Sequence, residues 1–257
     1  MNISPTELLA MYEMKFGPSA SAGPVHRRWL RAGYFSPNDY YEAALDQLVK
    51  PGCSWLDVGG GTTLFPRNPD LSRRLADRCR RLVGVDPSPN IHENPYIHER
   101  VQALIEDYKT DEPFDLLTLR MVVEHISHPN DALAAMARLV RPGGRVVIYT
   151  VNKYAPTSIA AWVIPFWLHH PVKKVIWHSR AEDTFPVVYR MNTRRTLNDL
   201  ATAHGFCEEW FARLDDCRLF FRVPILGRLE LATWRAGRML GLRHPESCLM
   251  GVYRRSE

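Results

Sequence analysis

The chain has 257 residues, 46% of them hydrophobic and 24% charged, which is typical of a globular protein with one large domain and a sizeable core. Its net charge of +5 is uneven, because residues 1–125 carry 14 Lys and Arg against 17 Asp and Glu, whereas residues 126–257 carry 19 against 11. Five cysteines without a Cys-x-x-Cys pair, no secretory signal and no apolar segment long enough to span a membrane exclude a disulfide scaffold and a transmembrane protein and indicate a cytoplasmic setting.

Short apolar segments alternate with helical patterns along the chain, which predicts a parallel sheet with helices on both faces. The expected strands, in chain order, are Ser54–Val58, Leu82–Asp86, Val101–Ile105, Phe114–Leu119, Arg145–Val151, Glu208–Ala212 and Cys248–Tyr253. We therefore expect an α/β fold, with a doubly wound, mostly parallel, seven-stranded Rossmann-like sheet and helical insertions.

Three helices are expected between these strands. Asp70 can cap a helix whose apolar positions reach Leu82. A second helix covers Asp131 to Val140, and a third runs from Asn192 to Gly205, where a glycine can adopt the left-handed conformation that ends helices.

Glycines and an acid follow the first two strands. The first strand ends in Trp55-Leu56-Asp57-Val58-Gly59-Gly60-Gly61, where glycines let the backbone turn sharply and let a ligand approach it. Asp86 ends the second strand, where a carboxylate can accept hydrogen bonds from both hydroxyls of a ribose. Together they predict an adenosine site. Leu64 stands where a dinucleotide fingerprint needs its third glycine, and no Gly-Lys-Ser/Thr sequence is present, so a pyrophosphate ligand is disfavoured.

With these motifs the sequence resembles the class I S-adenosylmethionine-dependent methyltransferase family, specifically its small-molecule group. The resemblance extends over residues 52–206. It also rests, in this order, on Ile105-Glu106-Asp107, Phe114-Asp115-Leu116-Leu117, Glu124-His125-Ile126 and Leu139-Val140-Arg141-Pro142-Gly143-Gly144-Arg145. It implies S-adenosyl-L-methionine as the cofactor and a small molecule as the methyl acceptor.

The resemblance also implies which residues bind the cofactor, in four groups. These are Asp57, Gly59, Gly60 and Gly61 for the methionine part, Asp86 for the ribose, Pro87, Ile105 and Glu106 for the adenine, and Arg120 and Met121 for the sulfonium end. The family usually has another glycine where Thr63 stands, whereas here residues 64–69 intervene before the helix. This loop either covers the cofactor or is a slack connection.

His125 is the expected general base if the acceptor is a hydroxyl or a protonated amine, and an acceptor that is already nucleophilic needs none. A helix cap or a core position is the alternative role for this side chain. No metal is expected, because Met121 stands where quinone O-methyltransferases carry the first glutamate of a Glu-x-x-Glu-His site.

Three segments are added to the sheet. Residues 1–50 are expected to form an N-terminal helical cap on a methyltransferase domain of residues 51–257, and residues 152–191 and 215–245 are expected to provide the acceptor site. The last two segments are rich in aromatic residues and arginine, including Trp162, Phe166, Trp167, Trp177, Trp234, Arg218, Arg222, Arg228, Arg235 and Arg238. They favour a largely apolar or anionic acceptor, methylated on oxygen or nitrogen, but a peripheral membrane contact or a subunit interface would use the same residues.

Other classes of function stay open as alternatives. A nicotinamide-dependent oxidoreductase would keep Asp86 but lacks the third glycine, and a non-catalytic binding protein would retain the fold. A nucleic-acid partner is not expected, because Leu119-Arg120-Met121-Val122 replaces the Asn/Asp-Pro-Pro-Tyr/Phe of amino-methylating enzymes. Both a monomer and a homodimer are compatible with the sequence.

Overall fold

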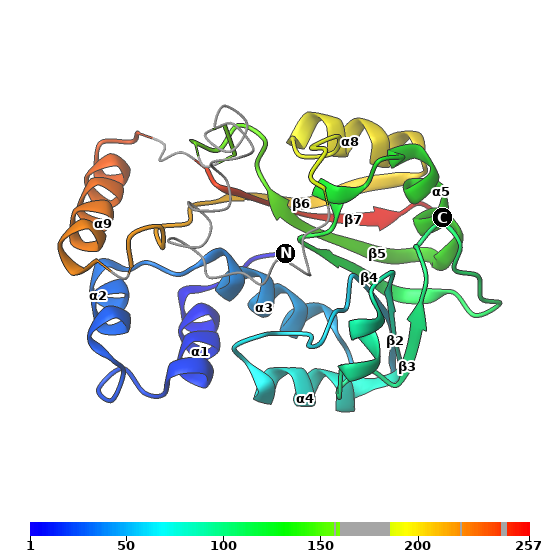
Figure 1. Cartoon of the computed structure of the whole chain (residues 1–257), viewed down its shortest axis with the longest axis horizontal. Coiled ribbons are helices and arrows are strands. Elements are labelled where there is room, and N and C mark those ends of the chain that lie inside the picture. The colour runs from blue at the N-terminus through cyan, green and yellow to red at the C-terminus, as the bar shows by residue number, and fades with distance from the viewer. Residues whose placement is uncertain (157, 160–185, 222, 243–245) are drawn as a thin grey trace.

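The computed structural model describes residues 1–156, 158–159, 186–221, 223–242 and 246–257. A seven-stranded sheet in the order β3-β2-β1-β4-β5-β7-β6 forms its centre (Figure 1). The strands are β1 (Cys53–Val58), β2 (Cys79–Asp86), β3 (Glu99–Gln102), β4 (Phe114–Arg120), β5 (Val140–Val151), β6 (Phe206–Leu214) and β7 (Cys248–Arg255). Strand β7 alone runs antiparallel to its two neighbours. The expected doubly wound, mostly parallel sheet is therefore confirmed.

The helices are α1 (Pro5–Phe16), α2 (Pro24–Ala32), α3 (Pro37–Leu48), α4 (Pro69–Arg78), α5 (Pro129–Leu139), α8 (Arg194–Ala203) and α9 (Pro224–Met239), with short 3-10 helices η1 (Pro89–Glu93) and η2 (Val123–His125). All of these α-helices except α8 begin with proline, whose fixed φ suits the first helical position and whose missing N–H costs nothing there. Proline thus marks most of the helix starts in the part of the chain that the structure describes.

Two cores lie on opposite faces of the sheet. Helices α3 and α4 cover one face, where Leu45 and Leu75 pack with Trp55. Helices α5 and α8 cover the other, where Met136 and Leu197 pack with residues of the central strands. Strand β1 is buried along its whole length, as expected for a strand with helices on both faces.

A third cluster joins the N-terminal helices to α9 at one end of the molecule (Figure 1). It contains Tyr12, Trp29, Tyr34, Cys217, Leu231 and Trp234. Helices α1 and α3 also share the core of the sheet, through Leu8 and Met11 of α1 and Leu45 of α3. The domain boundary near residue 50 stays a prediction. The aromatic residues Trp162, Phe166, Trp167 and Trp177 lie outside the described residues.

Several expected boundaries are wrong by a few residues: β2 begins at Cys79 and not at Leu82, and β5 begins at Val140 and not at Arg145. Helix α4 begins at Pro69 and is capped by buried Asn68, whose side chain accepts from the Leu71 N–H at 3.2 Å, so Asp70 is not its cap. The helix ends at Arg78 because β2 already begins at Cys79.

The third strand lies earlier than expected, at Glu99–Gln102, because the chain leaves the sheet directly after Ala103 donates to the Asp86 carbonyl at 3.1 Å. Helices α5 and α8 each lie within one to three residues of their expected limits. Gly205 follows α8 with a φ of 79°, as its glycine predicted. No helix in the described ranges is long and apolar enough to cross a membrane.

Candidate active site

Asp57 lies near the carboxyl end of β1, beside the point where the strand order reverses between β1 and β4. Ligands of doubly wound sheets bind in the crevice at such a point. Trp55 Nε1 donates to Thr118 Oγ1 at 2.8 Å, and Thr118 donates to Asp57 Oδ1 at 2.6 Å. Burial raises the pKa of Asp57 to about 6, against the lowering effects of the Thr118 hydroxyl and the Arg120 charge. A cation bound here would favour the ionised carboxylate.

The glycine loop after β1 is closed on one side and open on the other. Gly59 has a φ of 72°, and a Cβ there would lie 2.3 Å from Val122 Cγ2. Gly61 has a φ of 43°, and a Cβ there would meet no atom within 4 Å. Gly59 is therefore required for packing against the β4 loop, whereas Gly61 borders open space that a ligand can enter.

Asp86 and Asn94 hold this loop. Asp86 accepts from the Gly61 N–H at 3.0 Å through Oδ2 and from the Ser88 N–H at 2.8 Å through Oδ1. Asn94, fully buried, donates to the Gly60 carbonyl at 2.9 Å. Each carboxylate oxygen can accept a second hydrogen bond, so Asp86 retains acceptor capacity for two ribose hydroxyls.

The residues assigned to the adenine differ in exposure. Pro87 is exposed and Glu106 is half-buried, but Ile105 is only 5% exposed and packs in the core. Leu104, directly before it, is 52% exposed. The burial of Ile105 leaves little of its side chain for contact with an adenine ring, so its assignment stays a prediction.

The loop after β4 begins with a strained residue. Met121 has a φ of 55°, which is uncommon for a residue with a side chain, and its N–H donates to the Tyr149 carbonyl at 2.7 Å. The half-buried Arg120 directly before it lines the pocket described below. Strain of this kind tends to occur at functional sites.

Glu124 and His125 follow in η2 and have different surroundings. Glu124 is buried, accepts from Thr150 Oγ1 at 2.8 Å, and has a pKa raised by burial. His125 Nδ1 lies 3.0 Å from the Pro186 carbonyl oxygen. Because a carbonyl oxygen only accepts, the hydrogen of this contact belongs to Nδ1.

The loop of residues 64–69 is not a slack connection. Leu64 and Phe65 are buried in the core with α3 and α4, and Asn68 donates to Glu42 Oε2 at 3.0 Å. The loop thus belongs to the wall of the molecule between these two helices. Its Pro66 and Arg67 face a pocket.

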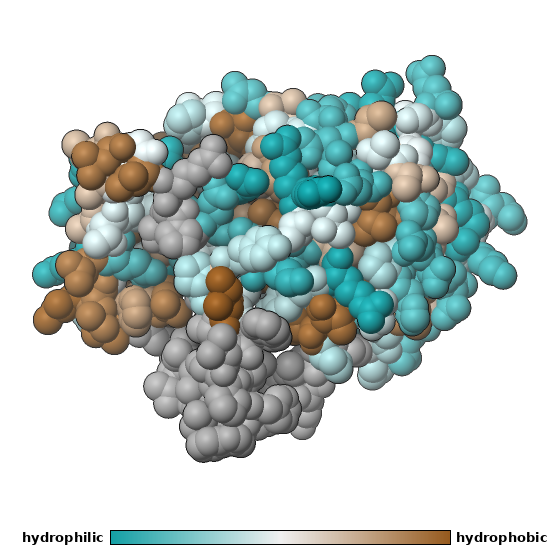
Figure 2. Space-filling view, turned by 90° about the horizontal axis from the view of Figure 1, so that it is seen from above, coloured by the Kyte–Doolittle hydropathy of each residue, from teal (hydrophilic) through white to brown (hydrophobic). Residues whose placement is uncertain are grey.

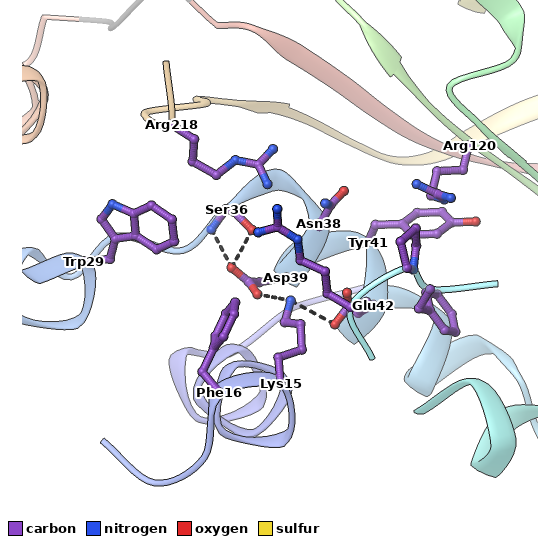
Figure 3. Close-up of a pocket in the computed structure, with 13 residues that line it drawn as sticks. Lys15, Phe16, Trp29, Ser36, Asn38, Asp39, Tyr41, Glu42, Arg120 and Arg218 are labelled. Carbon is purple, nitrogen blue, oxygen red and sulfur yellow. Dashed lines mark hydrogen bonds and ion pairs between the residues drawn. The ribbon is translucent and has the colours of Figure 1, made fainter. Parts of the chain in front are cut away.

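This pocket lies among the N-terminal helices, the 64–69 loop and the end of β4 (Figure 3). It encloses about 570 Å³ of space, its open mouth included. Its lining combines aromatic with charged side chains: Phe16, Trp29, Tyr41 and Phe65, with Lys15, Asp39, Glu42, Arg67, Arg120 and Arg218. Of the expected site residues, Arg120 lines it and His125 does not.

Most charges in this pocket are paired. Lys15 forms ion pairs with Asp39 and with Glu42 Oε2, the latter at 3.0 Å (Figure 3). Arg218 forms two hydrogen bonds of 2.6 Å with the carboxylate of Asp216. Neither Arg67 nor Arg120 forms an ion pair with an acid among the described residues, and the Arg120 charge acts on Asp57 only at longer range, so the pocket carries an excess of positive charge.

Sequence reasoning did not find several residues of this region. Thr118 could have been found, because a polar side chain in an otherwise apolar strand indicates a buried hydrogen bond. Asn94, Lys15 and Arg67 carried none, because their roles depend on contacts between segments far apart in the chain. Among the described residues, no group of three or more His, Cys, Asp or Glu is placed to hold a metal ion.

Comparison with known proteins establishes the family. A family model described as a methyltransferase domain matches residues 27–207, more than half of the chain. The chain belongs to the class I S-adenosylmethionine-dependent methyltransferases. S-adenosyl-L-methionine is accordingly its methyl donor, and the oxidoreductase alternative is set aside. The acidic pair of Asp57 and Asp86 beside an open glycine loop suits this cationic ligand better than it would suit a phosphate.

Similar proteins have varied reactions. The ubiquinone biosynthesis O-methyltransferase of Xanthomonas oryzae pv. oryzae (strain PXO99A) is 26% identical over 201 residues, which cover 64% of this chain and 80% of that protein. Similar structures include the N-methyltransferase NodS of Bradyrhizobium japonicum WM9 (TM-score 0.50, 14% identity, 86% of this chain and 97% of that one). Another is the cyclopropane synthase MmaA2 of Mycobacterium tuberculosis (TM-score 0.51, 14% identity, 95% and 98%). The structural likenesses concern the fold alone, so they do not identify the acceptor.

Proposed function

We propose that this enzyme methylates a hydroxyl group of a small aromatic acceptor that carries an anionic group, and that the acceptor binds in the pocket lined by Arg67 and Arg120. The observation that carries the proposal is that these two arginines line the pocket and form no ion pair with an acid among the described residues. An arginine in a partly desolvated pocket binds a carboxylate by charge-assisted hydrogen bonds.

The remaining walls of the pocket support an aromatic acceptor. Phe16, Trp29, Tyr41 and Phe65 provide flat apolar surfaces, which is how small-molecule sites commonly bury a ring. A relative named as an O-methyltransferase of ubiquinone biosynthesis supports oxygen as the methylated atom. The N-terminal helices of the proposed cap contribute seven residues to the lining of the pocket: Lys15, Phe16, Trp29, Asn38, Asp39, Tyr41 and Glu42.

The proposed mechanism needs little covalent chemistry from the protein. The bound cofactor supplies an activated methyl group, so the residues mainly position the acceptor and exclude water. We assign Asp57, Asp86 and the loop of Gly59–Gly61 to cofactor binding and Arg120 to the acceptor. His125 stays the proposed general base, and because it does not line the pocket, this role requires the acceptor's hydroxyl to extend beyond the pocket to the His125 ring, whose Nδ1 lies 3.0 Å from the Pro186 carbonyl oxygen.

Two acceptors that differ only in a carboxylate test this proposal: 3,4-dihydroxybenzoate and catechol. We expect Arg120→Gln to lower kcat/KM for 3,4-dihydroxybenzoate by about ten- to a hundredfold and to leave catechol nearly unchanged, because a hydrogen bond to a charged group contributes about 1.5–3 kcal/mol. His125→Gln should lower kcat for both acceptors to a similar extent, since it acts on the hydroxyl.

Arg195→Gln is the matched control, because Arg195 is 93% exposed on α8 and pairs only weakly with Asp199, at 3.7 Å. It should not change the ratio between the two acceptors. An equal effect of Arg120→Gln on both acceptors would contradict the anionic acceptor. Full activity of His125→Gln would show that the acceptor needs no base.

A further inference from the structure

Helix α9 has an apolar face on each side. Its inner side buries Gly227, Leu231 and Trp234, and the last two belong to the third cluster. Its outer side carries a second apolar row, consisting of Ile225, Leu229, Ala232, Ala236, Met239 and Leu240. At 100° per residue these six positions fall within an arc of about 100°, the width of an apolar stripe that normally faces a core.

This outer stripe is exposed. The exposed fractions are 76% for Ile225, 61% for Leu229, 79% for Met239 and 73% for Leu240. Val223 and Leu242, which flank the helix in the sequence, are also exposed. Figure 2 shows hydrophobic side chains gathered at the end of the molecule that α9 occupies. Contiguous apolar surface of this kind marks an interaction site.

The charges beside the stripe are all positive. Arg228 and Arg235 lie along one edge of it, about 20–40° beyond its last apolar position at 100° per residue. The Cζ atom of Arg238 lies 5.2 Å from the centroid of the Trp234 ring. The single acid of α9, Glu230, points to the other side, where it accepts from the N–H groups of Leu219 and Phe220 at 3.3 Å.

We propose that the outer stripe of α9 docks on the surface of a lipid bilayer that contains anionic lipids. An apolar stripe bordered by arginines matches a helix lying in the membrane interface, with its apolar side chains below the headgroups and its guanidinium groups among the phosphates. A second copy of this chain fits less well, because its stripe would bring arginines against arginines without an acid between them. The proposal does not depend on the identity of the acceptor.

Docking through α9 would also place the acceptor pocket at the membrane end of the enzyme. Leu231 and Trp234 of α9 share the third cluster with Trp29, and Trp29 lines the pocket. An acceptor that partitions into the bilayer surface would then be concentrated beside its site.

Co-sedimentation of the full chain with vesicles tests this proposal. One set consists of phosphatidylcholine, and the other of phosphatidylcholine and phosphatidylglycerol in equal amounts. We expect binding to the anionic vesicles that weakens at high salt, and at least tenfold weaker binding to phosphatidylcholine alone. The double variant R228Q/R235Q should weaken anionic binding about thirtyfold, because each arginine near the surface contributes about 1 kcal/mol.

Leu229→Glu tests the apolar part, with Leu9→Glu on α1 as its matched control. Both leucines lie on helices and are at least 36% exposed, so both variants should fold. Leu229→Glu should lose most vesicle binding, whereas Leu9→Glu should retain it. The proposal is overturned if the wild type does not bind anionic vesicles or if Leu229→Glu binds them as well as the wild type does. It is also overturned if the wild type is a dimer by sedimentation velocity and Leu229→Glu dissociates it.

Discussion

At the scale of single residues, Asp57 sets an expected pH dependence. Its pKa in the ligand-free protein is raised to about 6 by burial, from an ordinary value of 3.8. A cationic cofactor beside it favours the ionised form and displaces the proton. Cofactor affinity should therefore rise with pH through about pH 6 and level off above about pH 7. Titration calorimetry in two buffers of different ionisation enthalpy measures both the affinity and the proton released.

The same shift predicts a stability effect with the opposite sign. Because the folded protein binds the Asp57 proton more tightly than the unfolded chain, the contribution of this group to stability falls as pH rises from about 4 through about 6. Asp57→Asn should melt at a higher temperature than the wild type at neutral pH and bind the cofactor with little pH dependence. Asp111→Asn, on an exposed turn, is the control. If the wild type and Asp57→Asn showed the same dependence of cofactor affinity on pH, Asp57 would not be the group that titrates in the cofactor site.

At the scale of elements, the loop between β1 and α4 contains one glycine needed for packing, Gly59, and one that borders open space, Gly61. Gly61→Val places a side chain in the open space beside the loop, at the cost of a strained φ of 43°. We expect it to fold cooperatively with stability reduced by about 1–3 kcal/mol and to lose cofactor binding. Thermal melts and calorimetry measure the two effects.

Gly52→Val is the control that shows the effect of backbone strain alone, without a side chain beside the cofactor loop. Gly52 has a φ of 78° and no atom within 4 Å of an added Cβ, but it lies before β1, at the opposite end of the strand. It should lower stability by a similar amount and leave cofactor affinity unchanged. Normal cofactor binding by Gly61→Val would remove the loop from the proposed site.

The seven strands and the helices α4, α5 and α8 could be predicted from the sequence, because apolar period is a local property. Residues 1–50 were expected only as a helical cap without bounds, and α9 was not predicted. The third strand was misplaced because apolar Ile105 belongs to the core as part of a turn and not of a strand. The cap of α4 was missed because Asn68 also bonds to Glu42, 26 residues earlier. The pocket could not be predicted at all, since it depends on how α1 and α3 meet the β4 loop.

At the scale of the whole molecule, the third cluster connects the acceptor pocket to α9. Trp234 Nε1 donates to Asp215 Oδ2 at 2.9 Å, and its ring meets Tyr34 edge-on at 5.4 Å. The Tyr34 hydroxyl accepts from the Cys217 N–H at 2.9 Å, which positions the segment leading to Arg218. The cofactor crevice, in contrast, is supported by the two cores of the sheet.

Truncation of Trp234 should therefore affect the acceptor and not the cofactor. Trp234→Ala should reduce stability by about 3–5 kcal/mol, the usual range for a buried tryptophan, and raise the KM for 3,4-dihydroxybenzoate. Trp234→Phe, which keeps the ring packing and removes the bond to Asp215, should cost about 1–3 kcal/mol and change the KM less. In both variants, S-adenosylmethionine affinity measured below the melting range should equal that of the wild type. A loss of cofactor affinity in Trp234→Phe would show that the third cluster also supports the crevice, because that variant leaves the core around the ring nearly intact.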